Sequence, residues 1–475
     1  MRKVFWVLFL FYIAVFAYAD IRIKSVDEAI RIGLENNREI KTKLLEIMSA
    51  NASIKSSFAD LVLPSLNLSF KFSTFDPATL ERGITKVSSV KIVTNVVTNV
   101  FGVFTNLAFQ MEEKVVTNVF WDNYSLGIGI AYRVPYLAPF GLDLGFNSYW
   151  LQVRNRELVE LQYQKLISEY IHNVKLAYYN YLFAKELSKI AIETDRRLEE
   201  NVRIAEANFK AGIFSDLELI RAKVQLANNK PALFSSQNNV RLQKINLLLL
   251  LGIDVSKVDE VEIDGNVDEV KREFLDEVIS FDEGRRRVIE NNLDLKILRK
   301  LVDIAKVSKD VSLSANKPTF SLFFNYSYEF KKTNSMDNER VWTDSWVAGF
   351  QVNIPISELV PISKSYANME SADYSVQRAE YNYANALNSI LGQLEQVRLK
   401  CSEGLENIRA QKANVEQARR FLEIITTRYR FGSASTLDLI DAQIAYQQAE
   451  VNLLSAWISY TSSALGLRKL LGEVR

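Results

Sequence analysis

Four short segments of the chain alternate apolar and polar residues with a period of two. The first follows Pro64, and its apolar positions are Leu66, Leu68, Phe70 and Phe72. Alternation of this kind is typical of strands that have one apolar and one polar face. It predicts strands at about 66–75, 122–134, 319–331 and 344–354, paired as two hairpins.

Elsewhere the period of the apolar positions changes to three or four residues. No proline interrupts residues 362–429, where the average spacing close to 3.5 predicts one helix with a heptad seam and left-handed supercoiling. At 1.5 Å per residue such a helix is roughly 100 Å long. The seam consists of Met369, Ala372, Val376, Ala379, Tyr383, Ala386, Ile390, Leu394, Val397, Cys401, Leu405, Ile408, Val415, Ala418, Leu422, Ile425 and Tyr429.

The chain repeats itself. The stretch FKAGIFSDLELIRA at 209–222 returns as YRFGSASTLDLIDA at 429–442, an offset of 220. SVDEAIRIGLENN at 25–37 likewise matches SFDEGRRRVIENN at 280–292, an offset of 255. Such a match indicates one structural unit that has been duplicated.

In each copy the pattern of apolar residues, prolines and glycines predicts the order helix, strand, strand, long helix, turn, return helix. We expect a first repeat at 20–252, a linker at 253–279 and a second repeat at 280–475. In the first repeat the helices are expected at 25–62, about 142–209 and 216–252. In the second they are expected at 281–316, about 362–429 and 436–471.

The first copy carries an insertion of 34 residues. The offset between copies is 254 at Pro64 and Pro318 but 220 at Pro135 and Pro355, so the extra residues lie within 79–121. Their β-branched and aromatic content favours a lengthened hairpin or ordered cap over a disordered loop. A second irregularity is Pro231, which predicts a kink or break near Asn229 in the first return helix.

The repeated stretch has the features of a helical hairpin tip. Gly212 and Gly432 are placed to supply left-handed C-caps where the long helices end. Ser215 and Ser435, each followed three residues later by an acid, have the capping-box spacing that starts a return helix. The chain therefore makes two helical hairpins, each joined to a β-hairpin.

Residues 1–19 have the pattern of a cleaved signal peptide: Arg2 and Lys3, an apolar run, and Ala17 and Ala19 at a small-x-small site. An uncleaved anchor helix is the alternative. Lys plus Arg total 58 against 57 for Asp plus Glu, so charge gives no reason to expect nucleic acid. Cys401 and His172 are each the only residue of their type, and we interpret both as packing residues. No enzyme, metal or cofactor site is expected.

Four strands per chain cannot close a membrane barrel, because the smallest have about eight. Several copies must share one barrel. The order of helices and strands occurs twice, and each copy has a tip with the pattern G-x-x-S-x-L-[DE]-L-[IL], at 212–220 and 432–440. In these features the chain resembles the outer-membrane efflux protein family of TolC-like ducts, over essentially its whole mature length.

The resemblance implies a mixed α and β fold in a homotrimer. Three chains would form a 12-stranded transmembrane β-barrel, four strands from each, continued by a long α-helical coiled-coil barrel. An equatorial region would surround the helical barrel, and the linker at 253–279 fits it. It implies a passive exit duct in the outer membrane with a long periplasmic extension. Its partners would be outer-membrane lipid, a periplasmic adaptor protein and an inner-membrane pump. The cargo, whether drugs, metal ions or polypeptides, is not indicated.

The resemblance also implies a pore gate at the periplasmic tip, formed by Asp438 and Asp441. A separation of three places both on one helix face, and six carboxylates in a trimer would attract cations and raise some of each other's pKa values. Helix capping alone is the alternative role of Asp438. Asp441 corresponds to Arg221 in the first copy, so only one hairpin offers the double carboxylate.

The family's tip latch maps onto Glu218 and Tyr429, but its arginine position is Ala434 here. Arg430 is the candidate substitute. A function from another class is a periplasmic coiled-coil scaffold or adaptor that forms no pore. Such a scaffold would need no lipid-facing strands, so the four alternating segments favour the duct.

Overall fold

The computed structural model describes most of the chain as two compact units. Unit 1 contains residues up to Lys43, Gln162–Lys296 and Asn385–Arg475, and unit 2 contains Leu44–Leu161 and Ile297–Ala384. The predicted signal peptide and Gly432 lie outside the described residues. The described ranges are 22–74, 96–100, 103–107, 110–116, 119–134, 136–137, 141–142, 144–274, 279–314, 317–332, 340–355, 362–431 and 433–473.

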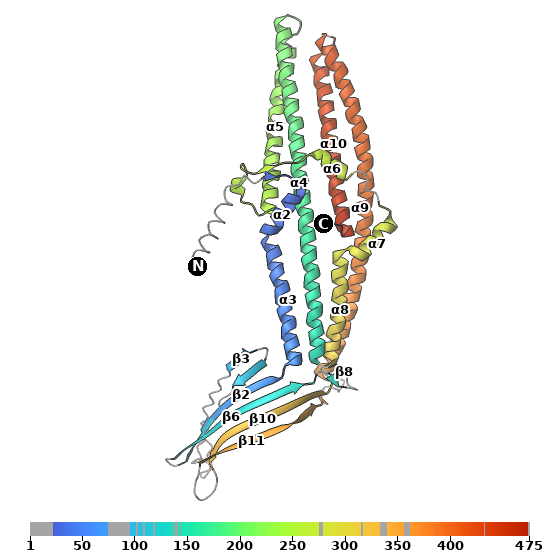
Figure 1. Ribbon diagram of the computed structural model, residues 1–475. Helices are drawn as coiled ribbons and strands as arrows, with labels where there is room; N and C mark the ends of the chain where they lie inside the picture. The colour runs from blue at the N-terminus through green and yellow to red at the C-terminus, as the bar shows by residue number, and fades with distance from the viewer. Residues whose placement is uncertain are drawn as a thin grey trace. The chain divides into compact units, whose positions relative to one another are not determined.

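The elements follow the same order twice (Figure 1). The first copy consists of α2 (Val26–Asn36), α3 (Arg38–Val62), β2 (Ser65–Thr74), β6 (Val119–Arg133), α4 (Leu144–Lys210) and α5 (Asp216–Leu250). The second consists of α7 (Phe281–Asn291), α8 (Leu293–Ser314), β10 (Thr319–Lys332), β11 (Arg340–Asn353), α9 (Lys364–Arg430) and α10 (Thr436–Leu471). The helices α4 and α9 have 67 residues each, close to the extents expected from the sequence.

One prediction about the helices is wrong in both copies. The helices expected at 25–62 and 281–316 are each two helices, separated at Asn37 and Asn292. Asn37 Oδ1 accepts the N–H of Ile40 at 3.0 Å, and Asn292 Oδ1 accepts that of Leu295 at 3.1 Å. Each asparagine leaves helical geometry to cap the next helix, which is a strong preference of this side chain.

The strands of unit 2 form a sheet in which β2, β6, β10 and β11 are neighbours, with β5 also paired to β2 and β6. All three pairings among the four predicted strands are antiparallel. Their register aligns the apolar positions into rows across the sheet. One row is Leu66, Ile130, Phe324 and Ala348, and the next is Leu68, Ile128, Tyr326 and Trp346.

The opposite face of this sheet contains mostly polar and small residues, with exceptions such as Phe323 and Val347. A side chain at Gly127 would lie 2.6 Å from Ser69 Oγ, and one at Gly129 would lie 2.6 Å from Asn325 Oδ1. Glycine at these two positions therefore leaves room for its polar cross-strand neighbours. Each strand thus has the two chemically different faces that the alternation predicted.

The described part of the insertion contains three short strands. They are β3 (Val96–Val100), β4 (Val103–Leu107) and β5 (Gln110–Val116). β3 and β4 pair as an antiparallel hairpin, and β5 pairs antiparallel with β6. A further two-stranded ladder joins β7 (Tyr136–Leu137) to β8 (Gly141–Leu142).

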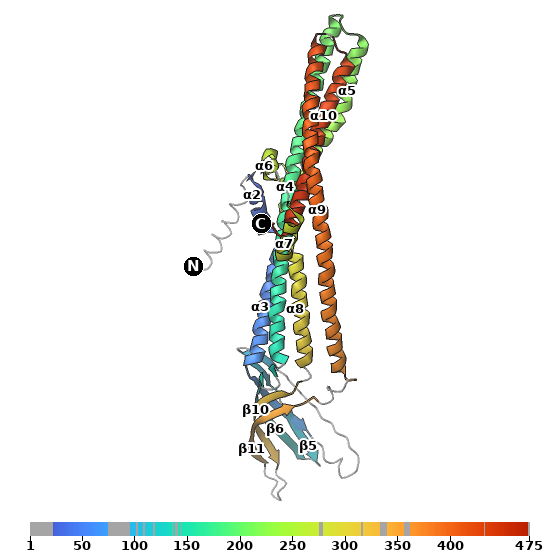
Figure 2. The same ribbon diagram turned by 90° about the vertical axis from the view of Figure 1, so that its right-hand side faces the viewer.

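The helices of unit 1 form two hairpins, α4 with α5 and α9 with α10, which lie alongside each other (Figure 2). Every position of the predicted seam of α9 is buried or half-buried, and Leu394 and Tyr429 are almost fully enclosed. The heptad pattern therefore identified the packed face correctly, and Cys401 is one of its buried residues.

The described part of the linker, residues 253–274 and 279, contacts both hairpins of unit 1. It contains η3 (Val255–Lys257), β9 (Glu262–Ile263) and α6 (Val267–Glu273), and β9 pairs with β1 (Arg22–Ile23). The Tyr179 hydroxyl donates to Glu273 Oε2 at 2.7 Å, and the Tyr460 hydroxyl donates to the Phe274 carbonyl at 2.8 Å. Arg468 of α10 adds an ion pair to Glu273 at 2.6 Å.

Of the kink or break expected near Asn229, the structure excludes the break. The helix α5 continues from Asp216 to Leu250 with Pro231 inside it. A proline removes one backbone hydrogen bond, and its ring crowds the preceding turn, yet the flanking turns can keep the helix going. None of the described helices combines the length and the apolar composition that crossing a membrane requires.

Candidate functional site

The first hairpin turns through Gly212 and Ser215. Gly212 has a φ of 71°, the left-handed conformation that glycine adopts without strain after a helix. The N–H groups of Gly212 and Ile213 donate to the carbonyls of Phe209 and Asn208. Ser215 Oγ accepts the N–H of Glu218 at 3.4 Å and starts α5.

The second hairpin restarts with a complete capping box. Asp438 N–H donates to Ser435 Oγ at 3.1 Å, and the Ser435 N–H donates to Asp438 Oδ2 at 2.9 Å. The Ser435 hydroxyl lies 2.8 Å from the same carboxylate oxygen. The hydrogen bonds from the Ser435 backbone and side chain lower the pKa of Asp438 in the single chain, and the backbone bond has the larger effect.

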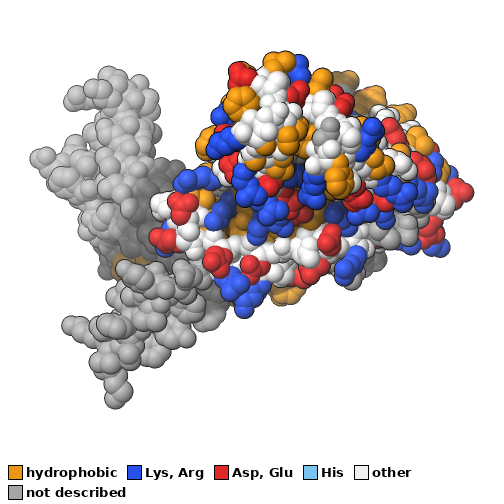
Figure 3. Space-filling view, turned by 90° about the horizontal axis from the view of Figure 1, so that it is seen from above, with side chains coloured by type: hydrophobic (Ala, Val, Ile, Leu, Met, Phe, Trp, Pro, Cys, Tyr) orange, Lys and Arg blue, Asp and Glu red, His pale blue; other side chains and the backbone are white. Residues whose placement is uncertain are grey.

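Asp438 and Asp441 are both exposed on the first two turns of α10. Their separation of three places them on one side of the helix. Figure 3 looks down on the hairpin ends, where acidic and basic side chains are interspersed with apolar ones. The hydrogen bonds between Ser435 and Asp438 show that Asp438 caps α10, whereas Asp441 makes no capping bond among the described contacts.

The two hairpins meet through Glu218. The N–H of Thr436, the first residue of α10, donates to Glu218 Oε2 at 3.2 Å. The other carboxylate oxygen of Glu218 lies 3.5 Å from Arg221 Nη1, one turn along α5. Among the described contacts Glu218 has no ion pair with Arg430, so Arg221 is the cation beside this carboxylate.

Tyr429 lies in an apolar cluster beside this contact. Its side chain is 1% exposed, and its hydroxyl and Thr436 Oγ1 share a hydrogen bond of 3.4 Å. The ring of Phe214, from the first tip, lies 5.3 Å from the Tyr429 ring. Burial, more than the nearby Glu218, raises the pKa of Tyr429.

Ala434 packs against the cluster that contains Tyr429, with the buried side chains of Ile425, Leu439 and Ala442. A small apolar residue thus occupies the position where the resemblance implied an arginine. Glu218 and Tyr429 do not bond each other directly. The structure brings them together through Thr436, which contacts both.

Sequence reasoning missed three residues of this site: Phe214, Arg221 as a partner of Glu218, and Thr436. Thr436 follows the recognised Ser435 cap directly, so its amide was a detectable candidate for an acidic partner. Phe214 aligns with Ala434 in the repeat, and no sequence signal showed that both pack on one tyrosine. Within the described ranges, no group of three or more His, Cys, Asp or Glu residues is placed to hold a metal ion.

Two helical hairpins and a sheet, built from one repeated unit with a shared tip contact, define the fold class of TolC-like ducts. A sequence profile described as outer membrane efflux protein matches residues 145–253, the helical hairpin of the first copy, and 285–473, nearly all of the second. The chain belongs to the outer membrane efflux protein family.

Individual relatives are distant but match over much of their length. The chain is 23% identical over 361 residues to the probable efflux pump outer membrane protein TtgC of Pseudomonas putida, covering 70% of this chain and 69% of the relative. It is 20% identical over 325 residues to the alkaline protease secretion protein AprF of Pseudomonas aeruginosa, covering 68% and 65%. The crystal structure of the Campylobacter jejuni CmeC outer membrane channel has the same fold. Its TM-score is 0.68 at 17% identity, covering 94% of this chain and 85% of that one.

Proposed function

We propose that the chain is one subunit of a passive outer-membrane exit duct. An inner-membrane pump and a periplasmic adaptor deliver the substrates, and the duct conducts them across the periplasm and the outer membrane. The observation that carries this function is the match of the efflux family to both repeats. The family is one of efflux proteins and not of enzymes. Relatives of the chain are named for efflux and for protease secretion, so we propose export and do not specify the cargo.

The sheet supports a shared wall in the membrane. Its in-register apolar rows leave large side chains uncovered, including Trp346 and Phe350 at 67% and 76% exposure. Lipid is the environment that favours such a face, and a pore-free scaffold would have no use for it. We propose that three copies contribute four strands each to one barrel.

The helices support the same assembly. Apolar side chains at spacings of three and four remain exposed along the start of α5, among them Leu217, Ile220 and Val224. A stripe of this kind on a long helix is normally covered by another helix. Neighbouring copies of the chain would cover it as the helical barrel closes.

The gate is assigned to Asp438 and Asp441. Both carboxylates are exposed at the tip of one hairpin, while the corresponding positions in the other hairpin hold Glu218 and Arg221. In a trimer six carboxylates would surround the axis and attract cations. Asp438 also caps α10, so the position of the charge ring is fixed by the same bonds that start the helix.

The latch is assigned to Glu218 and Tyr429, acting through Thr436. Glu218 holds the first hairpin to the N-terminus of α10, where a negative charge is favoured by the helix dipole. Arg221 keeps the carboxylate paired, and Tyr429 fixes the Thr436 side chain from the other direction. Opening of the tip would require these contacts to break.

The gate is tested by block of single-channel current with a trivalent cation. The Asp441→Asn and Asp438→Asn/Asp441→Asn variants should need at least about tenfold more cation for half block. Asp216→Asn, an exposed acid at the start of α5, is the matched control and should behave as wild type. Equal block in wild type and the double variant would remove the gate assignment.

A further inference from the structure

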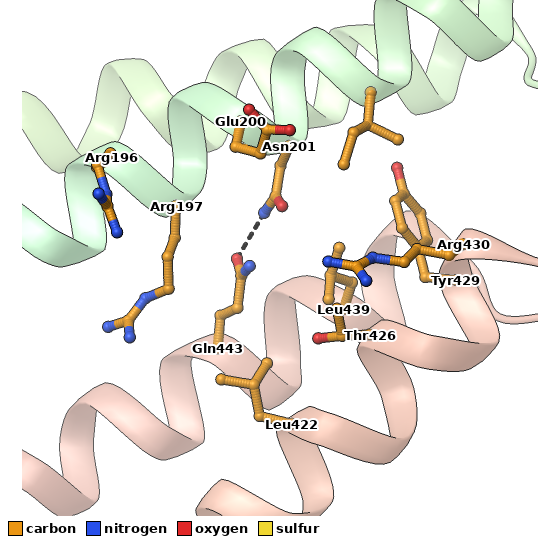
Figure 4. A pocket seen from close by; sticks show the side chains of 11 residues that line it. Arg196, Arg197, Glu200, Asn201, Leu422, Thr426, Tyr429, Arg430, Leu439 and Gln443 are labelled. Atoms are coloured by element: carbon orange, nitrogen blue, oxygen red, sulfur yellow. Dashed lines mark hydrogen bonds between the residues drawn. The ribbon is translucent and has the colours of Figure 1, made fainter.

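A cavity of about 430 Å³ lies beside the tip contact, within unit 1 (Figure 4). Its walls come from α4 of the first hairpin and from α9 and α10 of the second. This volume is within the range of small-molecule binding sites. Asp438 and Asp441 are not among the residues that line it, so it is separate from the proposed gate.

The charge of the lining is positive. Arg196, Arg197 and Arg430 contribute three guanidinium groups, while the lining contains one acid, Glu200. Glu200 is already paired with Arg203 at 2.7 Å. An anion in the cavity would therefore meet a surplus of cations.

Two of these arginines are available for a ligand. Arg197 stacks over the Tyr446 ring at 5.3 Å and lies 3.9 Å from Glu450. Arg196 and Arg430 make no ion pair with any residue that the structure describes, and they come from the two different hairpins. A planar guanidinium binds carboxylate through two parallel hydrogen bonds, which makes Arg well suited to this task.

Asn201 and Gln443 point toward one another across the cavity, as Figure 4 shows. Asn201 Nδ2 donates to Gln443 Oε1 at 2.6 Å, and both side chains are largely buried. The other amide atoms, Asn201 Oδ1 and Gln443 Nε2, have no hydrogen bond among the described contacts. Neither is among the enclosed polar atoms that lack a partner. Neither atom is therefore fully enclosed, and Gln443 Nε2, on a side chain that lines the cavity, is a donor without a partner among the described contacts.

We propose that this cavity binds a small organic anion with at least two carboxylate groups. Arg196 and Arg430 would hold the carboxylates, Gln443 would donate to one of them, and Leu422 and Leu439 would contact the carbon chain. The ligand would connect α4 to α9 and α10. Because it binds a site that exists only when the hairpins are packed together, it stabilises that arrangement by mass action.

The probe is citrate, added to the full-length protein in detergent. Titration calorimetry and thermal unfolding would be measured at constant ionic strength, with sodium chloride as the matched salt. We expect citrate to bind wild type and to raise its Tm. Arg196→Gln and Arg430→Gln should each weaken citrate binding by at least about tenfold, the loss of one charge-assisted contact.

Arg409→Gln is the control, because Arg409 lies on α9 with Arg430 and pairs with Glu406, and neither Arg409 nor Glu406 lines the cavity. It should bind citrate as wild type does. Circular dichroism of each variant shows whether its helices are intact. The proposal is overturned if citrate does not bind, if chloride reproduces its effect, or if the folded Arg430→Gln variant binds citrate with unchanged affinity. These experiments measure binding, whereas the proposed duct function is tested by conductance. Each proposal can therefore be contradicted without affecting the other.

Discussion

Single side chains decide how the two hairpin tips are joined. The carboxylate of Glu218 accepts the first amide of α10, and its neighbouring cation is Arg221 of its own helix. Ala434, at the position where the resemblance implied an arginine, packs against the apolar cluster around Tyr429. The tip contact of this protein therefore combines one charged cap with apolar packing.

Replacing Glu218 should weaken this contact. Glu218→Ala removes the acceptor of the Thr436 N–H, and a helix cap of this kind contributes about 1 kcal/mol. We expect a roughly fivefold rise in the open-to-closed ratio of single channels. Glu206→Gln, which alters an exposed pair with Lys223 in the same hairpin, is the control. An unchanged ratio in Glu218→Ala would contradict the latch.

The two helix-breaking asparagines should differ in their contribution to stability. Asn292 is 4% exposed, caps α8 and also donates to the Leu470 carbonyl at 3.0 Å. Asn37 caps α3, and its side chain also has a hydrogen bond with Tyr170, but it is less buried. Asn292→Ala should cost about 1–3 kcal/mol and Asn37→Ala about 1 kcal/mol, measured by thermal unfolding. An equal loss in both variants would contradict the larger contribution expected of the more buried Asn292.

The linker contact should weaken in strong alkali. Burial raises the pKa of Tyr178 from 10.0 to about 12, and its hydroxyl donates to the Asp264 carbonyl at 2.6 Å. A raised folded pKa means that the stabilisation is complete below pH 10 and is lost as the pH rises toward 12.

Unfolding followed by helical circular dichroism between these pH values tests this. Tyr178→Phe should be less stable than wild type at neutral pH and should lose less stability on alkalinisation. Other buried tyrosines, such as Tyr179, keep part of the dependence, because burial raises their pKa as well. Tyr381→Phe, at an exposed position, should match wild type. Parallel curves for Tyr178→Phe and wild type would contradict the assignment.

The sequence showed which tip residues cap helices, because Ser-x-x-Glu and Ser-x-x-Asp are local signals. It did not show that Glu218 reaches the amide of Thr436, a contact between residues 218 positions apart. The pair of Glu218 with Arg221 is local, at a spacing of three along α5, whereas the distance of Arg430 from this carboxylate depends on how the hairpins pack. Contacts between the hairpins depend on tertiary packing, which the pattern of residues along the chain does not specify.

At the scale of elements, the strands and the long helices were predicted well because their periods extend over many residues. The predicted seam of α9 is its packed face. The splits at Asn37 and Asn292 were missed because both asparagines lie inside a continuing helical pattern. The repeated Glu-Asn-Asn triplet was a signal, since Asn is preferred at helix N-caps and poorly suited to helix interiors.

Pro231 gives a prediction for α5. An interior proline costs a helix about 3 kcal/mol relative to alanine, and α5 continues through it. Pro231→Ala should therefore raise stability, by an amount up to this figure, in thermal unfolding. Ala232→Gly, one residue further on, should lower it by about 1 kcal/mol and shows that this turn is helical. A loss of stability in Pro231→Ala would indicate that the helix depends on the proline ring.

At the scale of the whole molecule, duplication explains why the chain has two tips, two β-hairpins and two capped helix breaks. The copies have diverged where their roles would differ. Glu218 and Arg221 stand in one tip where the other has Asp438 and Asp441. A duct with one pore-lining hairpin and one outer hairpin accounts for this difference.

The central claim is that several copies of the chain together form a water-filled duct. Single-channel conductance of the purified protein in a planar lipid bilayer tests it most directly. The account predicts discrete and uniform current steps that require the assembled oligomer. It is contradicted if protein shown to be inserted into the bilayer produces no steps.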